Sequence, residues 1–100
     1  LPLPLRRKLE IARALVAEPE VILLDEPAGG MTPSETFEMA ELINLHVAPG
    51  RTIVLIEHKI DLISKICNHL VVLNHGEKIV EGETHEVLSH KKVLEAYIGI

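Results

Sequence analysis

The sequence predicts an α/β fold built around a parallel sheet with flanking helices. Residues 21–24 and 52–56 are short, mostly apolar runs bounded by turn-forming residues, a pattern typical of strands that are buried on both faces. The segment between them carries the start and stop signals of a helix. A strand, a helix and a strand joined in this way form a right-handed βαβ unit, so both strands should end at the same edge of one sheet.

Residues 5–17 are expected to form an amphipathic helix before the first strand. Apolar side chains recur there at helical spacing, and most of the charged side chains lie on the other side. Pro19 should end this helix, because proline has no N–H to continue the hydrogen-bond ladder and disfavours helical backbone in the residue before it. The predicted buried face consists of Leu5, Leu9, Ala12 and Val16.

A second helix is expected to begin at Thr32, Pro33 and Glu35. Threonine can cap a helix, proline suits the first helical position, and a glutamate three residues after the cap completes a capping box. This helix should end at residues 48–50. Its predicted inner face consists of Phe37, Ala40, Ile43 and Val47.

The rest of the chain is expected to add a helix, a third parallel strand, a hairpin and short C-terminal helices. These elements are a helix at 60–67, a strand at 70–73, a turn at 74–77, a returning strand at 78–81, a helix from 84 to 88 capped by Thr84, and a last turn or two at 93–98. The predicted inward positions of the 60–67 helix are Ile60, Ile63, Ile66 and Cys67. Cys67 is the single cysteine, so it is expected to be a reduced, structural thiol.

Polar residues follow both strands of the βαβ unit. Asp25 and Glu26 end the first strand, and His58 follows the second. Open α/β folds bind ligands at the carboxyl edge of the sheet, where an aspartate can hold Mg²⁺ and a glutamate can orient and deprotonate an attacking water. We therefore expect these three side chains to be neighbours at a functional site. On these residues alone, two acidic residues at a strand exit and a structural or exposed histidine remain an alternative.

The other histidines share no metal-ligand spacing with His58 and are interpreted as surface or packing residues; they are His46, His69, His75, His85 and His90.

Length and composition set wider bounds. One hundred residues form one small domain or a piece of a larger one, and the chain reads as an excerpt because it lacks an initiating methionine. A net charge of −5 without a basic stripe argues against nucleic acid as the main partner. No apolar run approaches the roughly 18 residues of a membrane span, so a soluble, cytosolic chain is expected.

Five segments, in order and in spacing, resemble the C-terminal half of an ABC-transporter ATPase subunit. They are LEIARAL at 9–15, VILLDEP at 21–27, AGGMTP at 28–33, IEH at 56–58 and NHGEKIVEG at 74–82. Together they are specific, whereas each alone would be weak. The resemblance implies a partial P-loop NTPase fold of the ABC ATPase type, with parallel strands, flanking helices, and a C-terminal hairpin with short helices at 70–100.

The resemblance also implies roles for single residues and the cofactors ATP and Mg²⁺. In the Walker B segment at 21–27, Asp25 is similar to the aspartate that positions Mg²⁺, and Glu26 to the catalytic glutamate that polarises water. His58 is similar to the switch histidine that contacts the γ-phosphate. The D-loop, which crosses to a partner subunit, corresponds to Ala28, Gly29, Gly30, Met31 and Thr32. Thr32 stands where an aspartate is common in the family.

Two departures from the family pattern stand out. The signature region at 1–6 is degenerate, and Pro4 occupies a glycine position although proline has no N–H to donate to a phosphate. No G-x-x-x-x-G-K-[ST] loop, the Walker A motif of the family's N-terminal half, occurs in the chain. That loop cradles the β- and γ-phosphates. The 100-residue chain alone is therefore expected to be catalytically inactive.

Within the family, the chain is most similar to the ATP-binding subunits of branched-chain amino-acid importers. This similarity lies in 30–33, in the pair Glu57 and His58, and in the C-terminal segments 86–88 and 93–99. It implies an ATPase that drives import of a small solute, with a second ATPase subunit, identical or different, and transmembrane permease subunits as partners. It also implies a cytoplasmic location on the inner face of the cell membrane. The alternatives are urea import, lipopolysaccharide export, or a non-catalytic α/β remnant acting in protein contacts.

Overall fold

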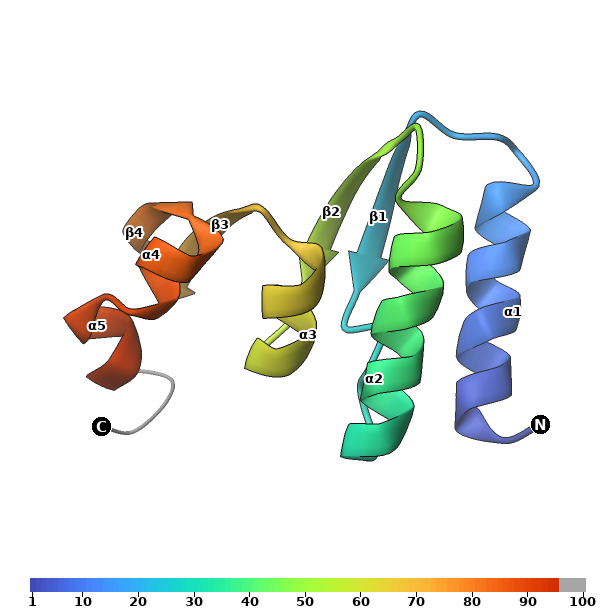
Figure 1. The fold of residues 1–100 in the computed structure, drawn as a ribbon, viewed down its shortest axis with the longest axis horizontal. Coiled ribbons are helices and arrows are strands. Elements are labelled where there is room, and N and C mark those ends of the chain that lie inside the picture. The colour runs from blue at the N-terminus through green and yellow to red at the C-terminus, as the bar shows by residue number, and fades with distance from the viewer. Residues whose placement is uncertain (96–100) are drawn as a thin grey trace. The chain divides into compact units, whose positions relative to one another are not determined.

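The computed structural model describes residues 1–95 and divides into two compact units, Leu1–Ile66 and Cys67–Ile100. The first unit contains six elements: α1 (Leu3–Leu15), β1 (Val21–Asp25), α2 (Pro33–Leu42), the π-helical turn η1 (Ile43–Val47), β2 (Thr52–Ile56) and α3 (Ile60–Ile66). Figure 1 labels all of them except η1, which continues α2. Strands β1 and β2 pair in parallel, with Val21 opposite Thr52 and Asp25 opposite Ile56. The predicted βαβ unit is therefore confirmed.

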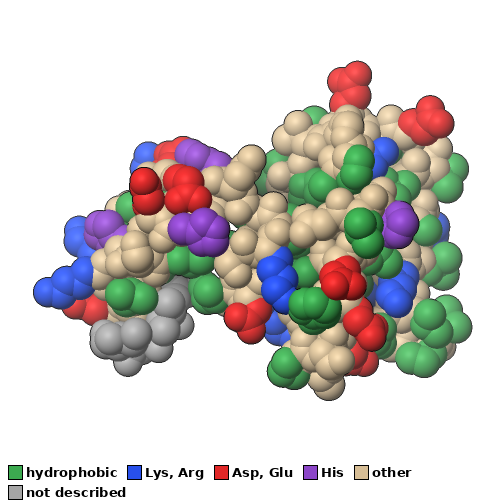
Figure 2. All heavy atoms as spheres, in the orientation of Figure 1, with side chains coloured by type: hydrophobic (Ala, Val, Ile, Leu, Met, Phe, Trp, Pro, Cys, Tyr) green, Lys and Arg blue, Asp and Glu red, His purple; other side chains and the backbone are tan. Residues whose placement is uncertain are grey.

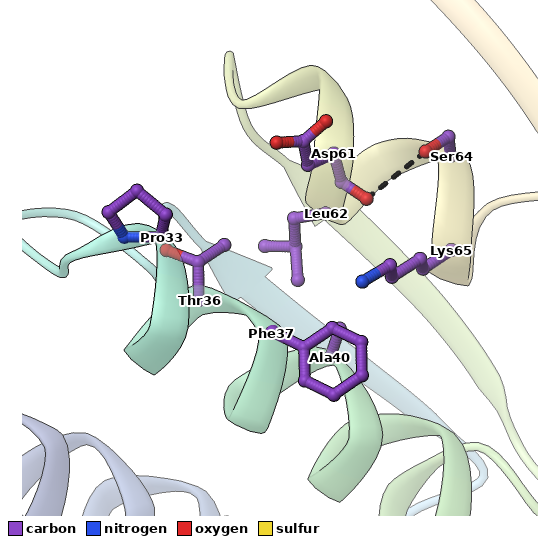
Figure 3. A pocket seen from close by; sticks show the side chains of 8 residues that line it. All are labelled: Pro33, Thr36, Phe37, Ala40, Asp61, Leu62, Ser64 and Lys65. Atoms are coloured by element: carbon purple, nitrogen blue, oxygen red, sulfur yellow. Dashed lines mark hydrogen bonds between the residues drawn. The ribbon is translucent and has the colours of Figure 1, made fainter.

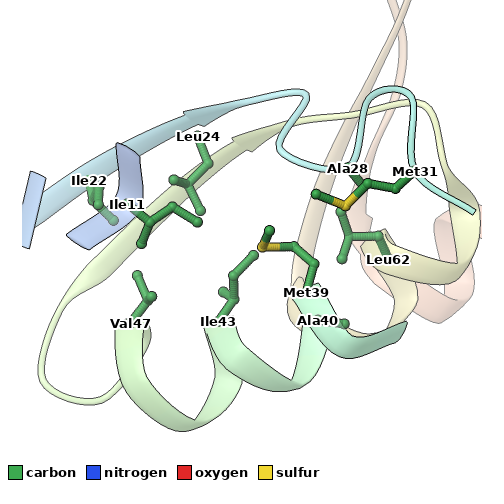
Figure 4. Close-up of a cluster of buried hydrophobic side chains, with 10 residues drawn as sticks. All are labelled: Ile11, Ile22, Leu24, Ala28, Met31, Met39, Ala40, Ile43, Val47 and Leu62. Carbon is green, nitrogen blue, oxygen red and sulfur yellow. The ribbon is translucent and has the colours of Figure 1, made fainter. Parts of the chain in front are cut away.

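The β1–β2 sheet is covered on one face only. Side chains alternate along β1, so that Ile22 and Leu24 are buried while Val21 and Leu23 are 55% and 73% exposed. The expectation of strands buried on both faces is thus wrong, because in this unit the helices contribute their apolar side chains to one face. Figure 4 shows the resulting core, which consists of Ile11, Ile22, Leu24, Ala28, Met31, Met39, Ala40, Ile43, Val47 and Leu62.

Helix α1 turns a different face to the core from the one predicted. Ile11 is buried, and Leu3 and Leu15 are partly buried and pack against the same core. These three residues form their own helical stripe, so the helix has apolar side chains on two sides and the contact with the strands selects between them. The prediction of the buried face was wrong, because all of its residues are exposed. They are Leu5, Leu9, Ala12 and Val16. The helix also starts earlier than predicted, at Leu3, because the prolines fit a first helical turn.

Helix α2 begins as the sequence predicts. The Thr32 hydroxyl accepts from the Glu35 amide at 3.2 Å, and the Glu35 carboxylate accepts from the Thr32 amide at 2.9 Å. Phe37 was predicted to face inward, but it is 47% exposed, and Met39 is buried in its place. The Phe37 ring instead lies 3.6 Å from Lys65 Nζ, a cation–π contact with α3.

The other predicted inner positions on this side are confirmed. Ala40, Ile43 and Val47 are buried, the last two within the π-helical turn η1, where the Ala48 amide bonds to the Ile43 carbonyl. On α3, Ile63 is buried as predicted, whereas Ile60 and Ile66 are half-buried.

Leu62 was not among the predicted inward positions, yet it is completely buried in the core. Cys67, predicted as the last inward position of this helix, is half-buried and lies one residue beyond it.

The second unit is a hairpin with two short helices. Its elements are β3 (His69–Asn74), β4 (Glu77–Glu83), α4 (Thr84–Leu88) and α5 (Lys91–Val93). The strands pair antiparallel around His75 and Gly76, which both have positive φ, as hairpin turns require. The predicted hairpin is confirmed. The expected third parallel strand is wrong, because in the described part of the chain β3 pairs with β4 alone.

The core of the second unit consists of Val72, Val87 and Val93. Glu83, rather than the predicted Thr84, caps α4, because its carboxylate accepts from the Glu86 amide at 3.0 Å. The predicted last turns at 93–98 lie partly outside the described residues. Among the described residues, no helix combines the length and the apolar character that a membrane crossing requires.

Candidate functional site

The end of β1 is shaped by the backbone of Glu26. Its amide still donates to the Ile56 carbonyl at 2.7 Å, so Glu26 remains attached to the neighbouring strand. Its φ of 47° lies in the left-handed region, which costs a residue with a Cβ atom about 1 kcal/mol. The chain therefore turns sharply out of the sheet at the residue that carries the second carboxylate.

Glu26 and His58 meet at the carboxyl edge of the sheet. His58 Nδ1 lies 3.0 Å from Glu26 Oε1, and the two side chains are 63% and 53% exposed. The predicted juxtaposition of this glutamate and this histidine is confirmed. When the Glu26 carboxylate accepts this hydrogen bond, Nδ1 of His58 is the donor and Nε2 stays outside the contact.

Asp25 lies at the same edge on the open face of the sheet, opposite Ile56. Its side chain is exposed and has no hydrogen-bond partner among the described residues. Mg²⁺ takes one or two carboxylates and keeps several waters, so a free, exposed carboxylate fits that ion. Asp25 is not part of the compact donor group formed by Glu26, Glu57 and His58, whose ligand atoms lie within 4.8 Å of one another.

The segment 28–32 leaves the sheet and runs to the cap of α2. Ala28 and Met31 are buried in the core, whereas Gly30 and Thr32 are exposed and Gly29 is half-buried. Gly30 has φ of 77°, and a Cβ there would meet Leu3 Cδ2 at 3.0 Å. Only part of the predicted D-loop is therefore available to touch another molecule, and the rest anchors it.

Glu57 and Lys59 flank His58 and were not predicted as site residues. The Glu57 side chain is fully buried, and its carboxylate accepts from the amides of His58 at 3.0 Å and of Ala28 at 3.4 Å. Lys59 Nζ donates to the carbonyls of Ala28 at 2.7 Å and Met31 at 2.9 Å. A buried charge without such partners would cost several kcal/mol. Their signal in the sequence is alternation, because residues 53, 55, 57 and 59 continue one face of the strand.

The hollow between α2 and α3 lies apart from these side chains. It has a volume of about 340 Å³ and, as Figure 3 shows, the Phe37 ring and Lys65 approach each other across it. Ser64 Oγ, on its rim, donates to the Asp61 carbonyl at 3.1 Å. None of the predicted site residues lines this hollow.

Titration of groups in the second unit is shifted by local contacts. Hydrogen bonds from His69 and then from Lys78 lower the pKa of Glu81, and the backbone amides of α4 lower the pKa of Glu83. Partial burial raises the pKa of the Cys67 thiol. The five histidines that were interpreted as surface or packing residues are all exposed.

Charged and apolar side chains are interspersed on the visible face of Leu1–Ile66, where Figure 2 shows no gathering of basic side chains.

Comparison with known proteins finds relatives whose names refer to ATP-binding proteins of transport or export systems. No model of a known protein family matches the chain. It is 42% identical over 95 residues to the high-affinity branched-chain amino acid transport ATP-binding protein LivG of Salmonella typhimurium, and 38% identical to BraF of Pseudomonas aeruginosa. It is 35% identical over 96 residues to the Nod factor export ATP-binding protein I of Cupriavidus metallidurans. These matches cover 93–94% of the chain.

The chain spans 37% of the length of the LivG and BraF proteins and 32% of the Nod factor export protein. Among solved structures, a nucleotide-free ATP-binding cassette from an ABC transporter superimposes with a TM-score of 0.83 at 34% identity, covering 100% of this chain and 41% of that one. An ATP-binding cassette in its ADP conformation gives the same TM-score at 36% identity and the same coverage. In sequence and in fold, the chain is therefore homologous to part of the ATP-binding cassette of ABC-transporter ATP-binding proteins.

Proposed function

We propose that the chain is the C-terminal part of an ABC ATPase that hydrolyses ATP to drive import of a small solute, in the branched-chain amino-acid class. The contact of Glu26 with His58 at the carboxyl edge of a parallel sheet carries this proposal. Relatives whose names refer to branched-chain amino acid transport support the solute class. In this reading, residues 1–6 are a degenerate signature, 21–27 the Walker B segment and 28–33 the D-loop.

Each site residue has one task in the proposed reaction. Asp25 would hold Mg²⁺, which when bound neutralises charge on the phosphate oxygens. Glu26 orients the attacking water and takes its proton. His58 is held by Glu26 through Nδ1, so its Nε2 is the atom that would face the γ-phosphate. Because the sequence holds no Walker A loop, the chain by itself is proposed to be inactive.

The proposed partners are a second ATPase subunit, identical or different, and transmembrane permease subunits. The exposed part of the 28–32 segment is the surface proposed to meet the second subunit. A solved relative, 32% identical with a TM-score of 0.78, is described as part of the ABC transporter complex cbiONQ. Binding to permease subunits would place the protein on the cytoplasmic face of the cell membrane.

Export is a second candidate function, favoured by one observation. The chain is 35% identical to the ATP-binding protein of Nod factor export, over nearly the same residues as to the amino-acid transport proteins. The site chemistry is the same for import and export, so transport assays with the permease subunits separate them. A non-catalytic remnant differs from both an importer and an exporter, because the completed subunit would then not hydrolyse ATP.

The test is Glu26→Gln in a subunit completed with an N-terminal half that supplies the Walker A loop. Because glutamine cannot take a proton from water, we expect turnover to fall about 10²-fold or more while ATP binding is retained. Glu20→Gln, at the exposed residue before β1, is the matched control and should leave turnover unchanged. Normal turnover of Glu26→Gln would remove Glu26 from its role.

The isolated chain gives a second check with labelled ATP. We expect no tight binding, since the contacts of the Walker A loop to the phosphates are missing. Tight binding by the 100-residue chain would contradict this account. An inactive completed subunit would favour a remnant that acts only in protein contacts.

A further inference from the structure

The residues after β2 alternate between the core and the solvent. The Glu57 side chain is fully buried, the His58 side chain is 63% exposed, and Lys59 is half-buried. This is the period of two expected of an extended chain. The histidine therefore points outward at the edge of the sheet while both of its charged neighbours point toward the 28–31 segment.

Glu57 binds this segment through a backbone amide. Its Oε2 accepts from the Ala28 amide at 3.4 Å, and its Oε1 accepts from the amides of His58 at 3.0 Å and Lys59 at 3.4 Å. One carboxylate thus joins Ala28, at the start of the segment that follows β1, to His58 and Lys59, which follow β2. A fully buried carboxylate is stable only with partners of this kind.

Lys59 binds both ends of the same segment. An ammonium group has three N–H donors, and Lys59 Nζ uses them on the Ala28 carbonyl at 2.7 Å, the Met31 carbonyl at 2.9 Å and Thr36 Oγ1 at 3.4 Å. Thr36 is buried in the first part of α2. One side chain therefore fixes the start of the loop, its end and the helix that follows.

Ala28 is bound on both sides by this arrangement. Its amide meets Glu57 and its carbonyl meets Lys59, two residues apart on either side of His58. The Met31 amide also donates to the Ala28 carbonyl, at 3.1 Å. A shift of the loop therefore breaks contacts of Glu57 and Lys59 and displaces the backbone that holds His58 against Glu26.

We infer that Lys59, together with Glu57, is a positioning residue that couples the conformation of segment 28–31 to the placement of the His58 ring. This inference rests on the proposed function in one respect. When a second ATPase subunit touches segment 28–31, the coupling changes the position of the His58 ring, which faces the nucleotide. The coupling itself is a property of the chain and needs neither nucleotide nor partner.

The first experiment uses NMR on the 100-residue chain and on Lys59→Met. Loss of hydrogen bonds to a charged group should speed amide exchange at Ala28 and Met31 by about tenfold or more, and should move the ring nitrogen signals of His58. Lys65→Met removes a charge from the next helix without a bond to the loop and should change neither. Faster exchange with unmoved His58 signals, or no change at all, would overturn the coupling.

A second measurement needs no variant, in case Lys59→Met does not fold. Acetylation of the native chain should modify Lys59 at least about tenfold more slowly than Lys65, because all three Lys59 donors are engaged. Equal rates would show that Lys59 Nζ is not held by these hydrogen bonds and would overturn its positioning role.

In the completed subunit, Lys59→Met should lower kcat several-fold with little change in KM for ATP, because Lys59 acts through His58 and not on ATP binding. Unchanged kcat, while Glu26→Gln is inactive, would overturn the functional coupling alone. Normal turnover of Glu26→Gln would instead count against the proposed function and leave the NMR result standing.

Discussion

The two strand ends that form the site are built in opposite ways. At the end of β1, the carboxylates of Asp25 and Glu26 are both exposed. At the end of β2, the side chain of Glu57 is buried and Lys59 is bound to two carbonyls of the loop. The exposed groups are those suited to bind a ligand or move a proton, whereas the buried groups hold the backbone. The side-chain hydrogen bonds that hold the loop backbone at this edge come from the residues after β2.

His58 is exposed like the β1 carboxylates although it belongs to the β2 end, and its replacement has the largest expected effect. In the completed subunit, His58→Ala should lower turnover about 10²-fold, since a positioned proton-bearing group is lost. Binding of ATP, measured by titration, should change much less. His46→Ala, an exposed histidine on η1, is the control and should behave as wild type. Equal losses of binding and hydrolysis would show that His58 is structural.

Removal of the carboxylate should lower the stability of the chain much more at Glu57 than at Asp25. Glu57→Ala leaves three backbone amides without their acceptor and should lower the free energy of unfolding by about 2 kcal/mol. Asp25→Ala removes an exposed group and should change it by less than about 0.5 kcal/mol. Urea unfolding of both variants of the chain measures this. Similar changes in the free energy of unfolding for the two variants would show that the two strand ends do not differ in this way.

Cys67 extends the contrast between buried and exposed groups to the second unit. Burial raises the pKa of its thiol, so the folded chain holds less thiolate at a given pH than the unfolded chain. The favoured neutral thiol adds stability below the unfolded pKa, and this is lost as pH rises through the folded pKa. Alkylation with iodoacetamide should therefore be slower in the native chain than in urea, and the ratio should shrink at higher pH. Faster alkylation of the native chain would contradict this.

Glu81 should give the smallest effect, because it is exposed. Hydrogen bonds from His69 and then Lys78 lower the pKa of Glu81, so its contribution is present above the unfolded pKa and lost as pH falls through the lower folded pKa. Glu81→Gln should flatten the acid side of the thermal unfolding profile slightly. Glu77→Gln, on the same strand, serves as the control. If the thermal unfolding temperature of Glu81→Gln falls with acid as it does in the wild type, then Glu81 and its partners do not contribute to the pH dependence of stability.

Local signals in the sequence predicted a good part of this fold. The capping box of Thr32 and Glu35, the two strands and the hairpin are all present, because each depends on neighbouring residues. The neighbouring positions of Glu26 and His58 followed from the parallel pairing of β1 with β2. The catalytic roles of these residues remain predictions.

Other features depend on contacts between distant residues. Helix α1 has two apolar stripes, and only its packing shows that Ile11 faces the core. The prediction that the parallel strands are buried on both faces was wrong, because no element of the described chain packs over Leu23. The β3 strand pairs with its hairpin neighbour and not with the parallel sheet. Lys59 was not predicted as a site residue because its acceptors, such as the Ala28 carbonyl, lie more than 20 residues away along the sequence.

The left-handed backbone of Glu26 restricts which side chain this position can carry. Aspartate adopts that conformation more readily than glutamate, so it would relax the turn. Aspartate is one methylene shorter, however, and from the same backbone its carboxylate would fall short of the His58 ring. The length of the acidic side chain, and not its charge alone, therefore determines whether the carboxylate reaches His58, even though a shorter acid would suit this backbone conformation better.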